Sequence, residues 1–187
     1  MKYLIVGLGN IGEEYRYTRH NIGFEILDAF AKASNIAFTA SRYGDVGEVK
    51  YKGRKFVLLK PSTYMNLSGK AVNYWLQKEQ LSPEKMLILV DDLALPTGAL
   101  RMRAKGSDAG HNGLAHINQT LGHSNYPRLR FGIGNDFSQG QQIDYVLGKW
   151  TDEQRKILPE RIDLAIDMIK SFGTIGTQRT MNTYNNR

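Results

Sequence analysis

Short, continuous apolar runs alternate along this chain with segments in which apolar residues recur at every third or fourth position. Runs of the first kind are typical of strands that are buried on both faces of a sheet. They occupy residues 3–6, 56–59, 86–90 and 129–134. Two further stretches, 46–50 and 99–103, alternate between apolar and polar residues, which predicts edge or half-exposed strands.

Helical periodicity lies between these runs and predicts helices over residues 22–33, about 68–78 and about 113–121. We expect a last helix to begin after Thr151, because Gln154 three residues later completes a capping box. It should end near Phe172 and Gly173, with a bend at Pro159.

Strands interleaved with helices predict an α/β fold, in which helices flank one twisted, mixed, largely parallel sheet. No repeat, linker or shift in composition marks a second domain, so we expect residues 1–187 to form a single domain. The tail, residues 174–187, contains no acidic residue and few apolar ones, which predicts a loose C-terminal segment.

Composition narrows the classes of function. The chain has no cysteine, which excludes disulfides, thiolate nucleophiles and thiolate metal sites. No apolar run is long enough for a membrane helix or a signal peptide, and we therefore expect a cytoplasmic protein. The formal net charge is +7, from 25 Lys and Arg against 18 Asp and Glu, which points to a polyanionic partner.

The first strand is followed by Gly7, Gly9 and Gly12, the spacing of the G-x-G-x-x-G motif that binds dinucleotides. That motif has a physical basis only where the glycines open a helix whose N–H groups meet a pyrophosphate. Here a polar and aromatic stretch follows, and helical periodicity begins only at Ile22. We therefore predict a long loop that carries chemistry, and a nicotinamide-dependent oxidoreductase becomes a secondary hypothesis.

Unusual polar residues gather in four segments, which are 10–21, 60–69, 91–93 and 110–113. The first three each follow a predicted buried strand. Because ligands of open α/β sheets bind beyond the carboxyl ends of the strands, we expect Asn10, His20, Asn66 and Asp91 around one crevice. Strands often end in polar loops, so one such loop means little. The inference of a shared crevice rests on finding three of them after buried strands.

His20 is the candidate general base, because an imidazole titrates near neutral pH and can take and return a proton. Asp91 is the candidate partner that fixes its tautomer, whereas Asp92 should point to the other face of the strand. The amides of Asn10, Asn66 and Asn112 suit a peptide-like or ester-like ligand. The alternatives are ordinary ones: a solvated loop histidine, and Asp and Asn in turns.

Other catalytic classes find little support. The spacings among His111, His116 and His123 match no common metal site, and we expect no metal and no cofactor. We interpret His116 as a residue on a helix face. Ser68 does not lie in a G-x-S-x-G elbow, so a serine hydrolase is unsupported.

Five cations form a set that we call the basic arm: Arg101, Arg103, Lys105, Arg128 and Arg130. Strand alternation predicts that the first three share one face, and the last two likewise, as a phosphate backbone requires. A charged edge strand that resists aggregation is the alternative. Tyr15, Tyr17 and Tyr64 offer surfaces on which bases could stack.

The chain resembles the bacterial peptidyl-tRNA hydrolase family in motifs that follow one another in order. These are Leu4–Asn10, Thr18–Gly23, Lys60–Gly69, Asp91–Leu93 with Leu95–Pro96, and Gly110–Leu114, and the likeness continues over 128–134. The run Lys60–Gly69 (KPSTYMNLSG) is highly specific, whereas the glycines alone are not.

The resemblance implies cleavage of the ester between a peptide and the 3′ end of tRNA, which recycles tRNA during translation. His20 would activate water, Asp91 would keep it basic and oriented, and Asn10 would recognise an N-blocked aminoacyl group. The tRNA and peptide-ester site would contain Tyr15, Tyr64, Met65, Asn66 and Asn112 together with Arg101, Arg103, Lys105 and Arg130. It implies a monomer without an obligate protein partner.

This sequence departs from the family pattern at three places. Ala94 stands where another acid is frequent, and Ala109 replaces a usual glycine next to Asp108. Arg101 and Arg103 stand where lysines are frequent, which keeps the charge and changes the hydrogen-bonding geometry. An RNA-binding protein on the same fold that has lost catalysis remains an alternative, although this chain has no added segment.

Overall fold

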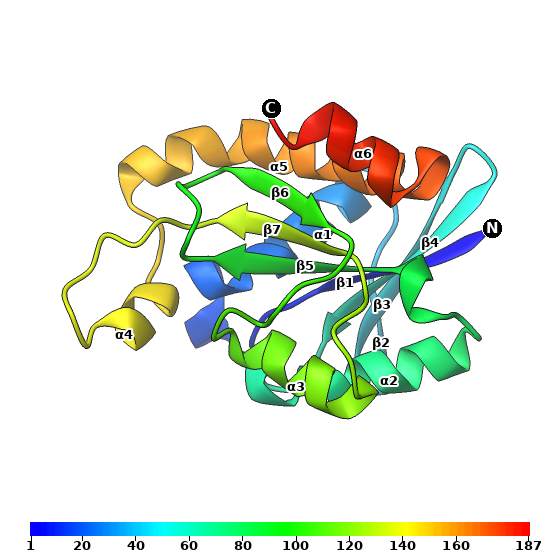
Figure 1. Cartoon of the computed structure of the whole chain (residues 1–187), viewed down its shortest axis with the longest axis horizontal. Coiled ribbons are helices and arrows are strands. Elements are labelled where there is room, and N and C mark those ends of the chain that lie inside the picture. The colour runs from blue at the N-terminus through cyan, green and yellow to red at the C-terminus, as the bar shows by residue number, and fades with distance from the viewer.

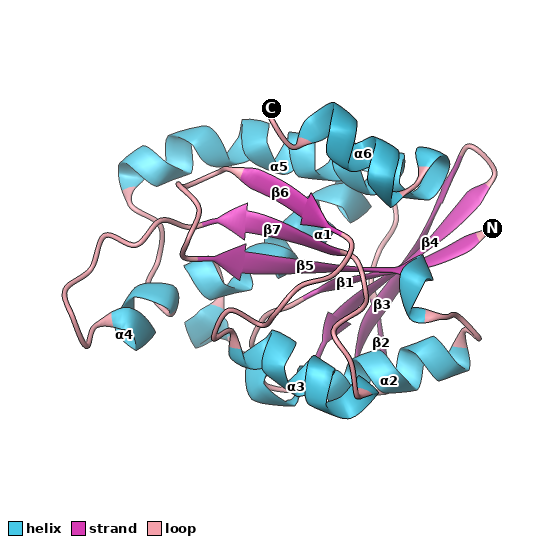
Figure 2. Cartoon of the chain, in the orientation of Figure 1, coloured by secondary structure: helices cyan, strands magenta, loops and turns pink.

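The computed structural model describes residues 1–187 and contains one seven-stranded mixed sheet with helices on both faces (Figures 1 and 2). The strand order is β2-β3-β4-β1-β5-β7-β6. The strands are β1 (Lys2–Gly7), β2 (Thr39–Ser41), β3 (Gly44–Tyr51), β4 (Arg54–Pro61), β5 (Met86–Asp92), β6 (Leu100–Arg103) and β7 (Arg128–Gly132). The four central strands β4, β1, β5 and β7 are parallel, and the outer pairings are antiparallel. The predicted fold class is confirmed.

Alternation along the central strands builds a core on each face of the sheet. Ile5 and Leu89 pack with α1 (Ile22–Ala33) and α5 (Asp152–Ile175) on one face. Val6 and Ile88 pack with α2 (Ser68–Lys78) and α3 (Asn112–Leu121) on the other. Both faces of these strands are therefore dry, which is why they appear in the sequence as continuous apolar runs.

The segment after β1 is a loop with two short 3-10 turns, Glu13–Tyr15 and Arg19–Asn21, and α1 begins at Ile22 as predicted. Only a three-residue 3-10 turn follows the glycines, and no α-helix opens there, so the dinucleotide motif lacks its helix N-terminus. Gly7 serves a close approach instead, because a Cβ there would overlap the carbonyl oxygen of Gly23 in α1. The glycines let the end of β1 touch the start of α1, which brings the loop back beside β5.

The prediction of a loose C-terminal tail is wrong. α5 continues through Pro159 to Ile175, and α6 (Thr177–Tyr184) packs on α5 and β6. Thr180 is fully buried and bonds to the Ser171 hydroxyl at 2.6 Å. Asn185 bonds to both the N–H and the carbonyl of Met102 in the edge strand β6. The tail has few apolar residues because its order comes from polar contacts that satisfy a sheet edge.

Three further elements were not predicted, namely β2, α4 (Gln142–Val146) and α6. The predicted capping box at Thr151 and Gln154 is present at the start of α5. No helix is both long and apolar enough to cross a membrane.

Candidate active site

His20 and Asp91 meet in a buried hydrogen bond. His20 lies in the 3-10 turn before α1, and Asp91 is the sixth residue of β5. His20 Nδ1 lies 2.7 Å from Asp91 Oδ2, and the side chains are 11% and 3% exposed. Asp92 points to the other face and pairs with Arg130. The predicted contact between His20 and Asp91 is confirmed. It forms because β1 and β5 are neighbouring parallel strands, so the loops that follow them leave the sheet at the same edge.

His111 contacts the second oxygen of the same carboxylate, with Nε2 2.8 Å from Asp91 Oδ1. His111 is also the N-cap of α3, and its Nδ1 accepts the N–H groups of Gly113 and Leu114. Because Nδ1 is an acceptor, Nε2 carries the hydrogen and donates it to Asp91. The ionised Asp91 then accepts from His20 Nδ1, which leaves the lone pair of His20 on Nε2.

The pKa values of the pair support this arrangement. Burial disfavours the charged forms of both groups, but His20 and His111 hold the pKa of Asp91 well below its usual range. Burial also opposes protonation of His20, and the charge and hydrogen bond of Asp91 outweigh it, so the His20 pKa is raised. The carboxylate therefore stays ionised and makes the imidazole a stronger base.

Sequence reasoning missed His111 as part of this group. The segment 110–113 and the family motif contain His111, but no role was assigned to its side chain, and its position just before a predicted helix was the available signal. His20, Asp91 and His111 hold ligand atoms within 4.8 Å of one another, as a metal site would. Both nitrogens of His111 and both oxygens of Asp91 are already hydrogen-bonded. We therefore assign the three to a hydrogen-bond chain.

Arg19 fixes the turn that carries His20. Its guanidinium is buried, donates to the carbonyl oxygen of Tyr145 at 2.9 Å and to Gln154 Oε1, and lies 3.9 Å from the Tyr145 ring centre. Tyr145 belongs to α4 and Gln154 to the first turn of α5. The position of His20 thus depends on elements that come more than 100 residues later.

Asn10 is held with one donor unused. Its Oδ1 accepts the Met65 N–H at 2.7 Å, and its backbone N–H and carbonyl both bond to the Asn21 side chain. The Asn10 amide is thereby oriented with Oδ1 toward the protein, and Nδ2 donates to no group of the chain. This side chain offers a fixed donor to a ligand.

A cavity of about 380 Å³ opens beside the His20 pair. Its lining includes His20, Asp91, His111 and Asn112, the α4 residues Gln142, Ile143 and Val146, and the cations Arg103, Lys105, Arg128 and Arg130. The other predicted site residues do not line it. Tyr64 and Asn66 are exposed, Tyr15 is half-buried, and Met65 is buried under the Asn10 amide. The expected single crevice is therefore found only in part.

Comparisons with known proteins place this chain. A family model described as peptidyl-tRNA hydrolase matches residues 4–187. A peptidyl-tRNA hydrolase of Phocaeicola vulgatus is 65% identical and one of Bacteroides fragilis 61% identical, each over the full length of both chains. The chain belongs to the peptidyl-tRNA hydrolase family. A crystal structure of the Acinetobacter baumannii peptidyl-tRNA hydrolase is similar, with 36% identity and a TM-score of 0.92 over 98% of this chain and 94% of that one.

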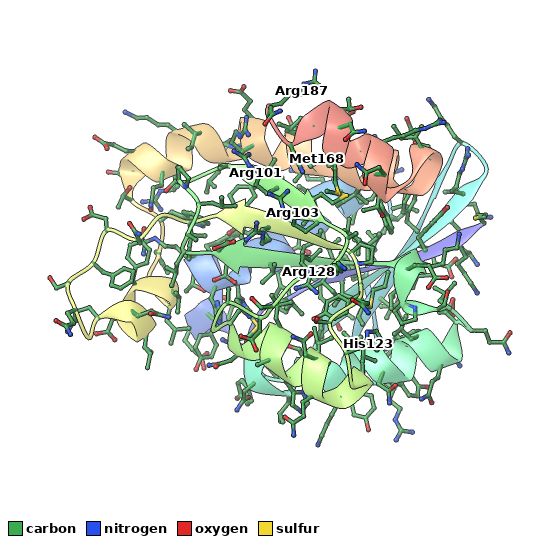
Figure 3. The ribbon with its side chains drawn as sticks, viewed as in Figure 1. Arg101, Arg103, His123, Arg128, Met168 and Arg187 are labelled. Carbon is green, nitrogen blue, oxygen red and sulfur yellow. The ribbon has the colours of Figure 1, made fainter.

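The basic arm of this family member is only partly available to a ligand. Arg101 pairs in register with Arg130, and Arg103 with Arg128, so all four arginines share one face at the β6 edge. Figure 3 labels Arg101, Arg103 and Arg128 along β6 and β7. Arg101 and Arg103 bond only to neighbouring carbonyls, at Leu100 and Met102. Arg130 donates to Asp92 at 2.9 Å, and its Nε is buried without a partner. Lys105 is exposed.

Arg128 does not fit its predicted role as a phosphate contact. It is 1% exposed and donates to the carbonyl oxygens of Tyr126, Ser107 and Ser124. The Arg128 guanidinium uses its donors on these backbone oxygens and so joins the loop before α3 to the loop before β7. Alternation along a strand predicted its face correctly and could not predict that these loops close over it.

Two departures from the family pattern now have local explanations. Asp92 Oδ1 accepts the Ala94 N–H at 2.8 Å, so the loop after β5 is fixed without a second acid at position 94. Ala109 has φ of 50°, a left-handed conformation that favours glycine. Asp108 closes this turn, since its side chain accepts the Gly110 N–H and its carbonyl accepts the His111 N–H.

Proposed function

We propose that this protein hydrolyses the ester between a peptide and the 3′ end of tRNA, and so returns tRNA to translation. The observation that carries the proposal is the free Nε2 lone pair of His20, set beside a cavity by an ionised Asp91. Membership of the family supplies the substrate class. The reaction takes place in the cytoplasm, and a monomer suffices for it because all the proposed groups come from one chain.

His20 Nε2 takes a proton from a water molecule, and the resulting hydroxide attacks the ester carbonyl carbon. The imidazolium then returns the proton to the departing 3′ oxygen of the tRNA. Asp91 stabilises the imidazolium through the hydrogen bond at Nδ1, and His111 holds the second carboxylate oxygen. The Nδ1 of His111 accepts backbone N–H groups, so His111 takes no proton from the water in this step.

Neutral amides recognise the peptidyl part of the substrate. The unused Nδ2 of Asn10 donates to the carbonyl that blocks the amino group, which a free aminoacyl-tRNA lacks. Asn112, on the cavity wall, and Asn66 contact the ester and the peptide backbone. Met65 supports them from below, since its N–H fixes Asn10.

Positive charge and aromatic surface hold the tRNA. Arg103, Lys105 and Arg130 line the cavity, and Arg101 continues the same face, so phosphates beside the 3′ end meet these four cations. Tyr15 and Tyr64 provide stacking surfaces, and Tyr64 is 52% exposed. Arg128 is left out of this set because its donors are used within the chain.

The test is hydrolysis of N-acetyl-aminoacyl-tRNA by the wild type and by His20→Ala. We expect the variant to lose about 10²–10⁴-fold in kcat, the size of a general-base contribution, while tRNA binding is retained. Unblocked aminoacyl-tRNA serves as the control substrate and should be cleaved poorly by both. Normal turnover in the variant would refute the role of His20, and an inactive wild type that binds tRNA would favour the RNA-binding alternative.

A further inference from the structure

Three lysines lie in one row across neighbouring strands. Lys50 in β3 is in register with Lys55 in β4, and Lys55 is in register with Lys2 in β1. Residues in register share a face of the sheet, and adjacent strands lie about 4.8 Å apart. Like charges directly opposite one another destabilise a sheet, so this row has an energetic cost.

The row borders an open hollow of about 400 Å³. Its lining consists of Met1, Lys2, Lys50, Gly53, Arg54 and Lys55, and no acidic side chain is among them. The turn between β3 and β4 adds the exposed Lys52. Two acids stand nearby, since Glu48 pairs with Lys55 and Glu79 with Lys2, each at 3.3 Å. Lys50 and Lys52 have no acidic partner.

Protection of a sheet edge explains only part of this arrangement. Lysines that resist edge-to-edge aggregation belong on outer strands. β2 pairs with β3 only over Gly44–Val46, and β5 pairs with β1 only from Leu4 onward, so Lys50 and Lys2 lie where their strands lack a second strand neighbour. Lys55 lies between β3 and β1, where the sheet has no free edge, and edge protection does not account for it.

The hollow lies at the opposite end of the sheet from the cavity. It surrounds the first residue of β1, whereas Asn10 and His20 follow the last one, and the six residues of β1 span about 20 Å. Figure 1 shows the β3–β4 hairpin and the N-terminus at one end of the molecule and α4, which lines the cavity, at the other. The ester end of a bound tRNA therefore cannot occupy both.

We propose that this hollow is a second anion site, which binds the phosphodiester backbone of RNA away from the ester-bearing 3′ end. Lysine ammonium groups are point charges that bind phosphate, and a row of them matches a ligand with regularly repeated charges. Met1 is the one strongly exposed apolar side chain in the lining, so the surface lacks the apolar face that insertion into lipid requires. This site is additional to the proposed ester hydrolysis and does not depend on it.

The experiment measures binding of a short, blunt-ended RNA duplex by fluorescence anisotropy between about 50 and 200 mM salt. It uses full-length Arg101→Gln/Arg103→Gln protein, in which the basic arm is weakened. Into this background go either Lys50→Gln/Lys52→Gln/Lys55→Gln or a control of equal charge change, Lys32→Gln/Lys156→Gln/Arg179→Gln, at exposed positions outside the hollow.

We expect the variant with Lys50, Lys52 and Lys55 replaced, which we call the hollow variant, to bind RNA more weakly than its parent, and the control variant to bind like the parent. In the hollow variant the slope of log affinity against log salt should become less steep by roughly 3, about one for each lysine. Equal losses in the two triple variants would overturn the proposal, as would a hollow variant that binds like its parent. An equal loss of affinity for poly-glutamate would also overturn it, by showing a site for acidic chains. Hydrolysis of N-acetyl-aminoacyl-tRNA, measured with the basic arm intact, should be unchanged by the hollow substitutions, so failure of one proposal is distinguishable from failure of the other.

Discussion

At the scale of single residues, the site depends on which nitrogen of each histidine carries its hydrogen. His111 is fixed as a donor at Nε2 because two backbone N–H groups occupy its Nδ1. That leaves Asp91 ionised between two donors and His20 with its basic nitrogen toward the cavity. The Asp91 carboxylate thus sets the tautomer of His20, and it accepts the hydrogen that His111 is constrained to carry on Nε2.

Asp91→Asn tests this chain through a pH profile. The raised pKa of His20 means that activity should fall as pH drops through that pKa, because the protonated ring cannot accept a proton. Replacing the carboxylate by an amide removes its charge, so the acid limb should move to lower pH while the rate falls by up to about 10⁴-fold. The measurement is kcat/KM against pH, and an acid limb that stays in place would contradict the role of Asp91.

At the scale of elements, the loop from β6 to α3 is held by hydrogen bonds within the loop and from β7, and it contains one residue in a left-handed conformation. Arg128 bonds to its Ser107 carbonyl, Asp108 closes a turn, and Ala109 takes a left-handed conformation. This loop ends in His111 and lines the cavity. Strained backbone conformations are common next to functional sites. The effect of the left-handed Ala109 on the stability of the protein can therefore be measured directly.

Ala109→Gly should relieve about 1–2 kcal/mol of left-handed strain and lose about 0.4–1 kcal/mol through greater freedom of the unfolded chain. We therefore expect a net gain of stability of about 0.5–1 kcal/mol in urea unfolding. Ala104→Gly in the same loop is the matched control, because Ala104 does not have a positive φ, and it should destabilise by a similar amount. Destabilisation in both variants would show that Ala109 is not strained.

The elements also show where sequence reasoning succeeds. Strands such as β5 and helices such as α1 could be predicted because their buried positions are occupied by apolar residues at regular spacing. β2, α4 and α6 are short or polar, and their order depends on distant partners such as Met102 for Asn185. The His20–Asp91 contact could be predicted from strand ends alone. His111 and the burial of Arg128 could not, because both depend on how loops close over the sheet.

At the scale of the whole molecule, the two ends of the sheet differ in chemistry. The cavity lies at the carboxyl ends of the parallel strands, and it is lined by His20, Asp91 and His111 and by most of the basic arm. The amino ends collect the row of lysines. Positive charge is thus clustered on at least two surfaces, which is why composition suggested a polyanion without indicating where it binds.

Burial of one carboxyl group, Glu25, should make the stability of the whole fold depend on pH. Glu25 in α1 accepts the indole N–H of Trp150, in the connection from α4 to α5, at 3.1 Å. Burial raises the Glu25 pKa to about 7; the Trp150 hydrogen bond opposes this rise, and the charge of Asp28 adds to it. An acid whose pKa is raised on folding stabilises the protein below its unfolded pKa of about 4.3, and that contribution is lost as pH rises through about 7.

Glu25→Gln keeps an oxygen that can accept the Trp150 N–H and removes the buried charge. The variant should therefore be more stable than wild type by on the order of 2 kcal/mol at pH 8, and the difference should vanish near pH 4. The measurement is urea unfolding at both pH values, with Asp163→Asn as the control at an exposed carboxylate in α5. A constant difference between wild type and Glu25→Gln at the two pH values would show that Glu25 is ionised in the folded protein as readily as in the unfolded chain.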